Sequence, residues 1–241
     1  MYFWVLIGVL LILILLGSRG GRVGKFVSYH VINLDRSPDR IAAFNARAAA
    51  AGLPPVERWR AADTKKITRE ETIAQNISGW LYDRAEKRKA FGMIGATISH
   101  RELLRYLATL PAADEDLHIV FEDDAAIPSD FFAKWATVAP YVPADHDMIY
   151  FGWLFPNMHK VAGPICAANP AWLNNGHVGN TGVNAYAVRH GAIPKILDHV
   201  AFSHTAFDNM ISEKATEWGV YYCNPQIVPQ DSDLGSTIVG V

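Results

Sequence analysis

Three consecutive carboxylates, Glu122-Asp123-Asp124, are the residues of this chain that most clearly predict chemistry. With Phe121 before them, they follow directly on the run Leu117–Val120, which is typical of a short buried β-strand. Negative charges so close together repel one another, and such a cluster commonly binds a cation. In open α/β sheets, ligands bind at the carboxyl ends of the strands. The sequence therefore predicts a divalent-metal site, and the alternative is a solvated acidic turn.

Length and composition narrow the class of protein. The chain has 241 residues and a formal net charge of −2, so it lacks the basic surplus of a typical nucleic-acid binder. Residues 26–241 suit a single α/β domain, with or without a small appended lobe. Cys166 and Cys223 show no metal-binding spacing, and the sequence does not decide whether they pair.

Residues 1–18 carry no charge and would span about 27 Å as a helix at roughly 1.5 Å per residue, close to the thickness of a bilayer core. A basic segment before them and an A-x-A cleavage site after them are both missing. We therefore predict an uncleaved transmembrane anchor rather than a signal peptide, followed by a basic linker over 19–25. The positive-inside rule favours a cytoplasmic catalytic domain. The secretory lumen is the alternative, and the sequon at Asn76 would then be accessible.

Apolar patterns along the remaining chain predict alternating strands and helices. This alternation indicates an α/β fold with a mostly parallel sheet, preceded by the transmembrane helix. Residues 153–180 are rich in Gly, Pro and Asn and predict a long loop. Strands are expected at 26–34, 56–61, 117–120, 147–151 and 183–188, and helices from Pro38, from Thr68, over 95–110 and over 192–200.

Several sequence blocks occur in a fixed order between residues 27 and 238. They are Val31–Arg40, Ala61-Ala62-Asp63, Ile94–His100, Val120–Asp124, Ala185–Val188 with Gly191-Ala192, Asp208, and a tail from Pro229 to Ile238. In this order the blocks resemble glycosyltransferase family 25, the lipopolysaccharide β-galactosyltransferases and procollagen galactosyltransferases. The family commonly has an acidic residue and a cysteine where this chain has Met93 and Ala96, and both positions look structural.

The resemblance implies a nucleotide-sugar-binding fold of the GT-A-like, Rossmann-like kind. It also implies a UDP-sugar donor, a divalent metal (typically manganese) and inversion at the anomeric carbon. We therefore predict transfer of galactose from UDP-galactose to a glycan or glycolipid acceptor, as in lipopolysaccharide biosynthesis. The alternatives are UDP-glucose or UDP-N-acetylglucosamine as donor, and a non-catalytic glycan-binding relative.

Alternation along a strand assigns different roles within the carboxylate cluster. Glu122 and Asp124 are expected to point the same way and to hold the metal, whereas Asp123 points elsewhere. Oxygen ligands of this kind suit Mn²⁺ or Mg²⁺. Asp123 is predicted to contact the ribose or the sugar of the donor.

Further donor-binding residues are predicted at the ends of the first two strands. Asn33, Arg36 and Arg40 follow the first strand, where the arginines can pair with phosphate oxygens. The alternative for the arginines is a salt-bridge network at the start of the helix. Asp63 follows the second strand and is expected to bind the ribose or uracil, with a loop cap as the alternative.

The acceptor is expected to bind at the long loop. Trp153, Trp172 and His177 are predicted to stack on a sugar and to form hydrogen bonds with it. The alternative is that the tryptophans fill the core beneath the loop. His100 is interpreted either as a ligand or as a buried residue that supports the site.

Asp208 is predicted to be the catalytic base. An inverting transfer needs a group that takes the proton of the acceptor hydroxyl, from a part of the chain distant from the metal carboxylates. Asp208 matches the acidic position of the family after the Gly-Ala helix. The alternative role is an N-cap for the helix that contains Met210, and Glu213 and His204 are the rival bases.

Overall fold

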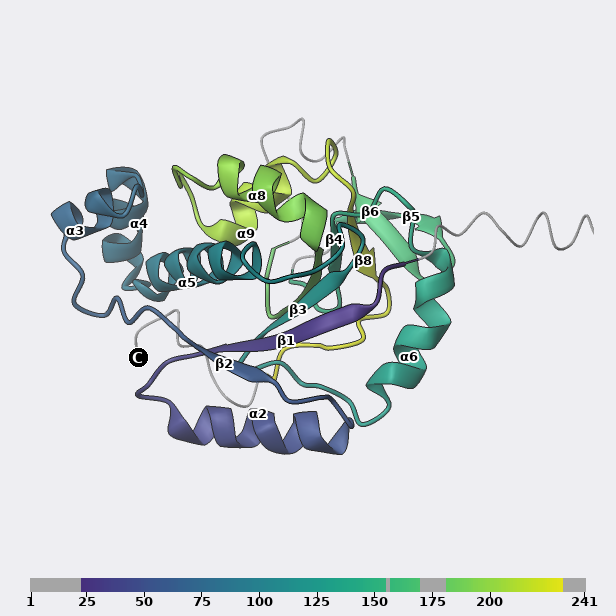
Figure 1. Ribbon diagram of the computed structural model, residues 1–241. Coiled ribbons are helices and arrows are strands. Elements are labelled where there is room, and N and C mark those ends of the chain that lie inside the picture. Colours follow the sequence, from purple (N-terminus) through teal and green to yellow (C-terminus); the bar gives the residue numbers. More distant parts are fainter. Residues whose placement is uncertain (1–22, 155–156, 170–180, 232–241) are drawn as a thin grey trace, which may run out of the picture.

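The structure, a computed structural model, describes residues 23–154, 157–169 and 181–231. These residues fold around one sheet of eight strands with helices on both faces (Figure 1). The strands are β1 (Phe26–Asn33), β2 (Glu57–Arg60), β3 (Leu117–Glu122), β4 (Met148–Tyr150), β5 (Met158–Ala162), β6 (Ile165–Ala168), β7 (Ala185–Arg189) and β8 (Val220–Cys223). The helices are α2 (Pro38–Ala50), α3 (Arg69–Ala74), α4 (Gly79–Arg88), α5 (Gly92–Leu107), α6 (Phe131–Val138), α8 (Ile193–His199) and α9 (Phe207–Glu213), with the 3-10 turns η1 (Ala139–Tyr141) and η2 (His190–Ala192).

The sheet is mixed, with the strand order β2-β1-β3-β7-β4-β8-β6-β5. Among the described strands, the pairings β3–β7, β4–β7, β6–β8 and β5–β6 are antiparallel, and only β1–β2, β1–β3 and β4–β8 are parallel. The prediction of a mostly parallel sheet is therefore wrong. The reason is that β6 and β7 each run against both of their neighbours, and each contributes two antiparallel pairings.

The two strands that run against their neighbours, β6 and β7, differ in how well the sequence predicts them. The sequence predicts a strand at 183–188, where the structure has β7, but a hydrophobic pattern does not state the direction in which a strand enters the sheet. β6 lies within the predicted loop over 153–180, where the structure places the hairpin β5–β6 with Gly163 in its turn at φ 50°. Cys166 on β6 and Cys223 on the neighbouring β8 are both buried free thiols.

Two hydrophobic cores form, one on each face of the sheet, because side chains alternate along the strands. Phe121 on β3 packs toward α2, where its ring lies 5.5 Å from that of Phe44. Val120 lies in the opposite core, with Leu104 of α5 and residues of α8 and α9. In Figure 1, α2 covers one face, and α5, α8 and α9 cover the other. The last residue of β3, Glu122, continues the alternation and contacts α5.

The predicted transmembrane helix, residues 1–18, lies outside the described residues. Within the described parts of the chain, no helix is long and apolar enough to cross a membrane. The longest of them, α5, has 16 residues, fewer than the roughly 20 apolar residues that a bilayer core requires. None of the described helices supports the predictions of a fold preceded by a membrane anchor, or of a single-pass protein with a cytoplasmic or lumenal catalytic domain, and these predictions are not retained.

His118 on β3 is buried in a row of hydrogen-bonded polar side chains. Its Nδ1 lies 2.7 Å from Ser28 Oγ, and its Nε2 lies 3.0 Å from His190 Nδ1. Burial, together with His190 and His30, lowers the pKa of His118 to about 4, and Asp116 opposes this effect. The fold therefore keeps the ring neutral at pH values where the same ring in the unfolded chain is protonated.

We expect acid to destabilise the fold through His118. The unfolded ring takes up a proton near pH 6.5 and the folded ring only near pH 4, so the free energy of unfolding falls as the pH drops through this window, by roughly 1–3 kcal/mol from this group. Above about pH 6.5 both states are neutral and the contribution is constant. Urea unfolding at about pH 7 and about pH 4.5 measures the loss. His118→Asn should lose less stability on acidification than wild type, and an equal loss would contradict the assignment.

Candidate functional site

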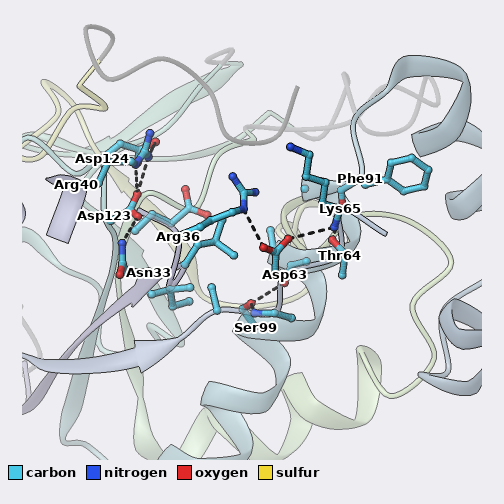
Figure 2. A pocket seen from close by; sticks show the side chains of 18 of the residues that line it. Asn33, Arg36, Arg40, Asp63, Thr64, Lys65, Phe91, Ser99, Asp123 and Asp124 are labelled. Atoms are coloured by element: carbon cyan, nitrogen blue, oxygen red, sulfur yellow. Dashed lines mark hydrogen bonds and ion pairs between the residues drawn. The ribbon is translucent and has the colours of Figure 1, made fainter. Parts of the chain in front are cut away.

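A pocket of about 480 Å³ opens where β1, β2 and β3 end, in the parallel part of the sheet (Figure 2). Its volume lies within the roughly 300–1,000 Å³ of typical small-ligand sites. The start of α5 and the turn after β3 also contribute to its wall. The pocket brings together all seven residues predicted to bind the donor and the metal: Asn33, Arg36, Arg40, Asp63, Glu122, Asp123 and Asp124.

Arg40 links the first turn of α2 to the two aspartates after β3. Arg40, Phe44 and Ala48 are buried at four-residue spacing, so they form one stripe of α2 that faces the sheet. Arg40 Nε donates to Asp123 Oδ1 at 2.7 Å, and Arg40 Nη2 donates to Asp124 Oδ2 at 3.0 Å. The guanidinium therefore neutralises part of the carboxylate cluster and holds both aspartates in place.

The carboxylate of Asp124 has one oxygen that is paired and one that is suited to bind a cation. Its Oδ2 accepts hydrogen bonds from Arg40 Nη2 and, at 2.9 Å, from Gln230 Nε2. Its Oδ1 is buried and has no hydrogen-bond partner among the described residues. Burial and the negative charge of Glu122 raise the pKa of Asp124. A buried carboxylate oxygen without a donor is costly, and a bound cation would compensate it.

The side chains that the structure describes do not by themselves make a complete metal site. The described residues contain no group of three or more His, Cys, Asp or Glu side chains placed to hold a metal ion. Mg²⁺ and similar ions are often held by only one or two carboxylates, with substrate phosphates and water completing the shell. Glu122 and Asp124 fit a site in which two carboxylates hold the ion and substrate phosphates and water complete the shell.

Glu122 contacts a different helix from the two aspartates. Its Oε1 lies 3.3 Å from His100 Nε2 on α5, whereas Asp123 and Asp124 contact Arg40 on α2. The predicted alternation, with Asp123 turned away from Asp124, ends with β3 because residue 123 already belongs to a turn. All three carboxylates still line the same pocket.

Asn33, at the end of β1, is buried in the same network. Its Nδ2 donates to Asp123 Oδ2 at 2.7 Å, and its Oδ1 accepts from Arg58 Nε at 2.8 Å. Asn33 therefore fixes Asp123 and also contributes to the pocket wall. Direct contact of Asn33 or Asp123 with a donor stays a prediction.

Arg36 and Asp63 form an ion pair in the pocket wall, with 2.9 Å between Nε and Oδ2. Asp63 Oδ1 also accepts the Lys65 backbone N–H at 3.2 Å, which is the loop cap that the sequence left open. Both charged side chains are about half exposed, so the pair is weak and can open for a ligand. In Figure 2 this pair lies between Asp123 on one side and Lys65 with Phe91 on the other.

Several residues of the pocket wall are not predicted by residue type and spacing. Gln230 arrives because its segment runs beside the turn after β3, where Ala126 N–H donates to Pro229 O at 2.8 Å. Ser99 Oγ accepts from Ala62 N–H at 2.9 Å and attaches α5 to the pocket. Gln230 and Ser99 do lie within the ordered sequence blocks, and this was the signal that could have found them. Lys65 and Lys89 also line the pocket, and no block contains them.

Asp208 lies in the first turn of α9, where Ala206 is the N-cap residue, so Asp208 is not the N-cap. Its Oδ2 accepts from Gly182 N–H at 3.1 Å and its Oδ1 from Asn209 N–H at 2.8 Å. Burial raises the pKa of Asp208, those two bonds oppose the increase, and the negative charge of Glu122 adds to it. Asp208 and Glu122 therefore lie close enough for their charges to interact.

The rival bases pair with each other at the other end of α9. His204 Nε2 lies 2.8 Å from Glu213 Oε1, and both side chains are exposed. Exposure and mutual pairing give neither group the desolvated environment that makes Asp208 a stronger base than usual.

Of the three residues predicted to bind the acceptor, the structure describes only Trp153. Trp153 packs partly buried against the core, and its Nε1 donates to Cys223 O at 2.9 Å, which agrees with the alternative core-filling role. It is not among the described residues that line the pocket. Trp172 and His177 lie outside the described residues.

The fold and the pocket define an α/β protein with a carboxylate-lined ligand site at the ends of three parallel strands. A family model described as Glycosyltransferase family 25 (LPS biosynthesis protein) matches residues 26–211, from β1 into α9. The chain therefore belongs to glycosyltransferase family 25 and is a glycosyltransferase, which confirms the resemblance found in the sequence blocks. No curated protein shows significant similarity to the chain.

Proposed function

We propose that the chain transfers galactose from UDP-galactose to a hydroxyl group of a glycan or glycolipid acceptor, with inversion at the anomeric carbon and with Mn²⁺ or Mg²⁺ as cofactor. Membership of family 25 supports the transfer of a sugar. The observation that carries the proposal further is Asp124 Oδ1, a buried pocket oxygen without a hydrogen-bond partner among the described residues.

Charge supports the need for a cation. Glu122, Asp123 and Asp124 all line this wall of the pocket, and Arg40 pairs with the two aspartates only, so the wall stays negative and would repel a diphosphate. Glu122 and Asp124 would hold the ion. When bound, the ion supplies positive charge to the diphosphate that leaves.

The rest of the pocket offers groups for the nucleotide. Asn33 and Asp63 line it with an amide and a carboxylate, which suit hydroxyl and base edges. Arg36, Lys65 and Lys89 line it with positive charges, which suit phosphate oxygens. This combination agrees with a sugar nucleotide as the ligand.

Asp208 is the proposed base. It takes the proton of the acceptor hydroxyl while that oxygen forms a bond to the anomeric carbon. At the same time the bond from this carbon to the diphosphate oxygen breaks, and UDP leaves with the electron pair. Burial raises the pKa of Asp208, so its carboxylate binds a proton more strongly than an exposed one.

A panel of UDP-sugars tests the proposal directly. UDP release is measured with UDP-galactose, UDP-glucose and UDP-N-acetylglucosamine, each with Mn²⁺ and with EDTA. We expect the fastest release from UDP-galactose and only in the presence of the cation. Faster release from another donor would move the assignment to that sugar, and cation-independent release from all three would overturn the metal assignment.

Replacing Lys89 should weaken binding of the UDP-sugar without lowering the free energy of unfolding. This residue ends α4 in the left-handed region, with φ 53°, a conformation that glycine adopts without strain. Lys89→Gly removes the strain and the charge together. We expect the free energy of unfolding to stay constant or to rise by up to about 1 kcal/mol, and the KM for the UDP-sugar to rise by about 3- to 10-fold. Thermal unfolding and steady-state kinetics measure the two effects.

Asn76 provides the matched control for this variant. It also has a positive φ, 55°, but it is not among the described residues that line the pocket. Asn76→Gly should leave the KM for the donor unchanged. If Lys89→Gly also leaves that KM unchanged, Lys89 is only a helix cap.

A further inference from the structure

His100 is a fully buried side chain at the meeting point of α5, β3, β7 and α9. Its Nε2 lies 3.3 Å from Glu122 Oε1 on β3, and its Nδ1 lies 3.1 Å from the Tyr186 hydroxyl on β7. Its ring stacks on Phe207 of α9, with centroids 4.9 Å apart and an interplanar angle of 11°. Three different elements therefore hold this imidazole in one orientation.

The chemistry of the three groups determines which atom donates in each hydrogen bond of the row formed by Tyr186, His100 and Glu122. A carboxylate only accepts hydrogen bonds, so the Nε2 that faces Glu122 must carry the proton. In the neutral ring, Nδ1 is then an acceptor, and the Tyr186 hydroxyl donates to it. Burial raises the pKa of Tyr186, so its phenol keeps the proton that it donates. The order is Tyr186 O–H to His100 Nδ1, and His100 Nε2–H to Glu122.

The same histidine lies against the start of α9. Phe207 N–H donates to Thr97 Oγ1 at 3.2 Å, one turn before His100 on α5, and the Phe207 ring covers the imidazole. The next residue is Asp208, whose pKa is raised by burial and by the negative charge of Glu122. The imidazole therefore lies between the proposed cation ligand and the proposed base.

We propose that His100 is a positioning residue that fixes the Glu122 carboxylate for the cation, and that Tyr186 sets the tautomer it needs to do so. This inference rests on the proposed function, because it assumes that Glu122 holds the ion. Partners that orient ligand side chains in this way typically change metal affinity by about 10- to 100-fold when they are removed.

Tyr186→Phe is the sharpest test, because it deletes one hydroxyl and keeps the aromatic ring. Binding of Mn²⁺ is measured in the presence of UDP through the electron paramagnetic resonance signal of free Mn²⁺, without turnover. We expect the Kd for Mn²⁺ to rise by about 10-fold. Tyr222→Phe is the matched control, since Tyr222 is a buried tyrosine whose ring stacks on Tyr150 rather than on His100, and it should retain wild-type affinity.

Two variants of the histidine distinguish positioning from mere packing. His100→Gln keeps an N–H donor that can reach Glu122, whereas His100→Leu keeps volume without a donor. We expect His100→Gln to retain most of the Mn²⁺ affinity and His100→Leu to lose it. Tyr186→Phe should cause no further loss in the His100→Leu background, because the two residues act through one hydrogen-bonded row.

The outcomes separate this inference from the proposed function. Wild-type protein that binds Mn²⁺, together with an unaltered Tyr186→Phe or equal losses in His100→Gln and His100→Leu, would overturn the role of His100 alone. Wild-type protein that binds no Mn²⁺ in the presence of UDP would overturn the metal assignment and this inference with it.

Discussion

Replacing Asp124 with asparagine is expected to lower UDP-sugar turnover by at least about 100-fold. The amide keeps an oxygen for Arg40 and Gln230, which both donate to Oδ2 of the native side chain. It replaces Oδ1, which has no hydrogen-bond partner in the described part of the chain, by an NH₂ group that cannot bind a cation. The fold should survive, so the loss should appear in UDP release and in Mn²⁺ affinity rather than in the melting temperature.

Asp130→Asn is the control for this variant. Asp130 is an exposed carboxylate that pairs with Lys134 at 3.0 Å, and it is not among the described residues that line the pocket. Its variant should turn over donor at the wild-type rate. Turnover by Asp124→Asn that is close to wild type, and equal with and without EDTA, would show that Asp124 holds no catalytic ion.

Replacing Asp208 with asparagine is expected to lower transfer by about 10²- to 10⁴-fold, the usual contribution of a general base. Both carboxylate oxygens accept backbone N–H groups, from Gly182 and Asn209, and an amide has only one oxygen to offer. We therefore also expect a modest loss of stability, on the order of 1 kcal/mol. The affinity for UDP should not change, because the proposed role of Asp208 is toward the acceptor and not the nucleotide.

Glu213→Gln tests the rival base in the same assay. Glu213 pairs with His204 in an exposed position, so its amide should transfer sugar at a rate near wild type. If Asp208→Asn transfers at the wild-type rate while Glu213→Gln does not, the proton goes to Glu213. If both variants are fully active, neither carboxylate is the base.

The grouping of the predicted donor and metal residues in one pocket was predictable because it depends on local pattern. The run before Glu122 predicts a buried strand, and the carboxyl ends of parallel strands meet at one edge of a sheet. For this reason the predicted residues at the ends of β1, β2 and β3 come together in one pocket. The order of the sequence blocks added the family, which composition and spacing alone do not specify.

The predictions that failed depend on information that a single sequence holds only weakly. Alternation of strands and helices favours a parallel sheet, but the direction of β7 is set by tertiary packing between β3 and β4. Alternation also placed Asp124 on the same side as Glu122, but β3 ends at Glu122, and Asp124 turns with Asp123 toward Arg40. Gln230 reaches the site through a contact between distant segments, which residue spacing cannot predict.

The central claim is that this pocket binds UDP through a cation held by Glu122 and Asp124. Calorimetric titration of the wild-type chain with UDP, once with Mn²⁺ and once with EDTA, tests it most directly. The account predicts binding with Mn²⁺, an affinity at least about 10-fold weaker with EDTA, and the same weak affinity for Asp124→Asn under both conditions. Equal UDP affinity with Mn²⁺ and with EDTA in the wild-type chain would contradict it.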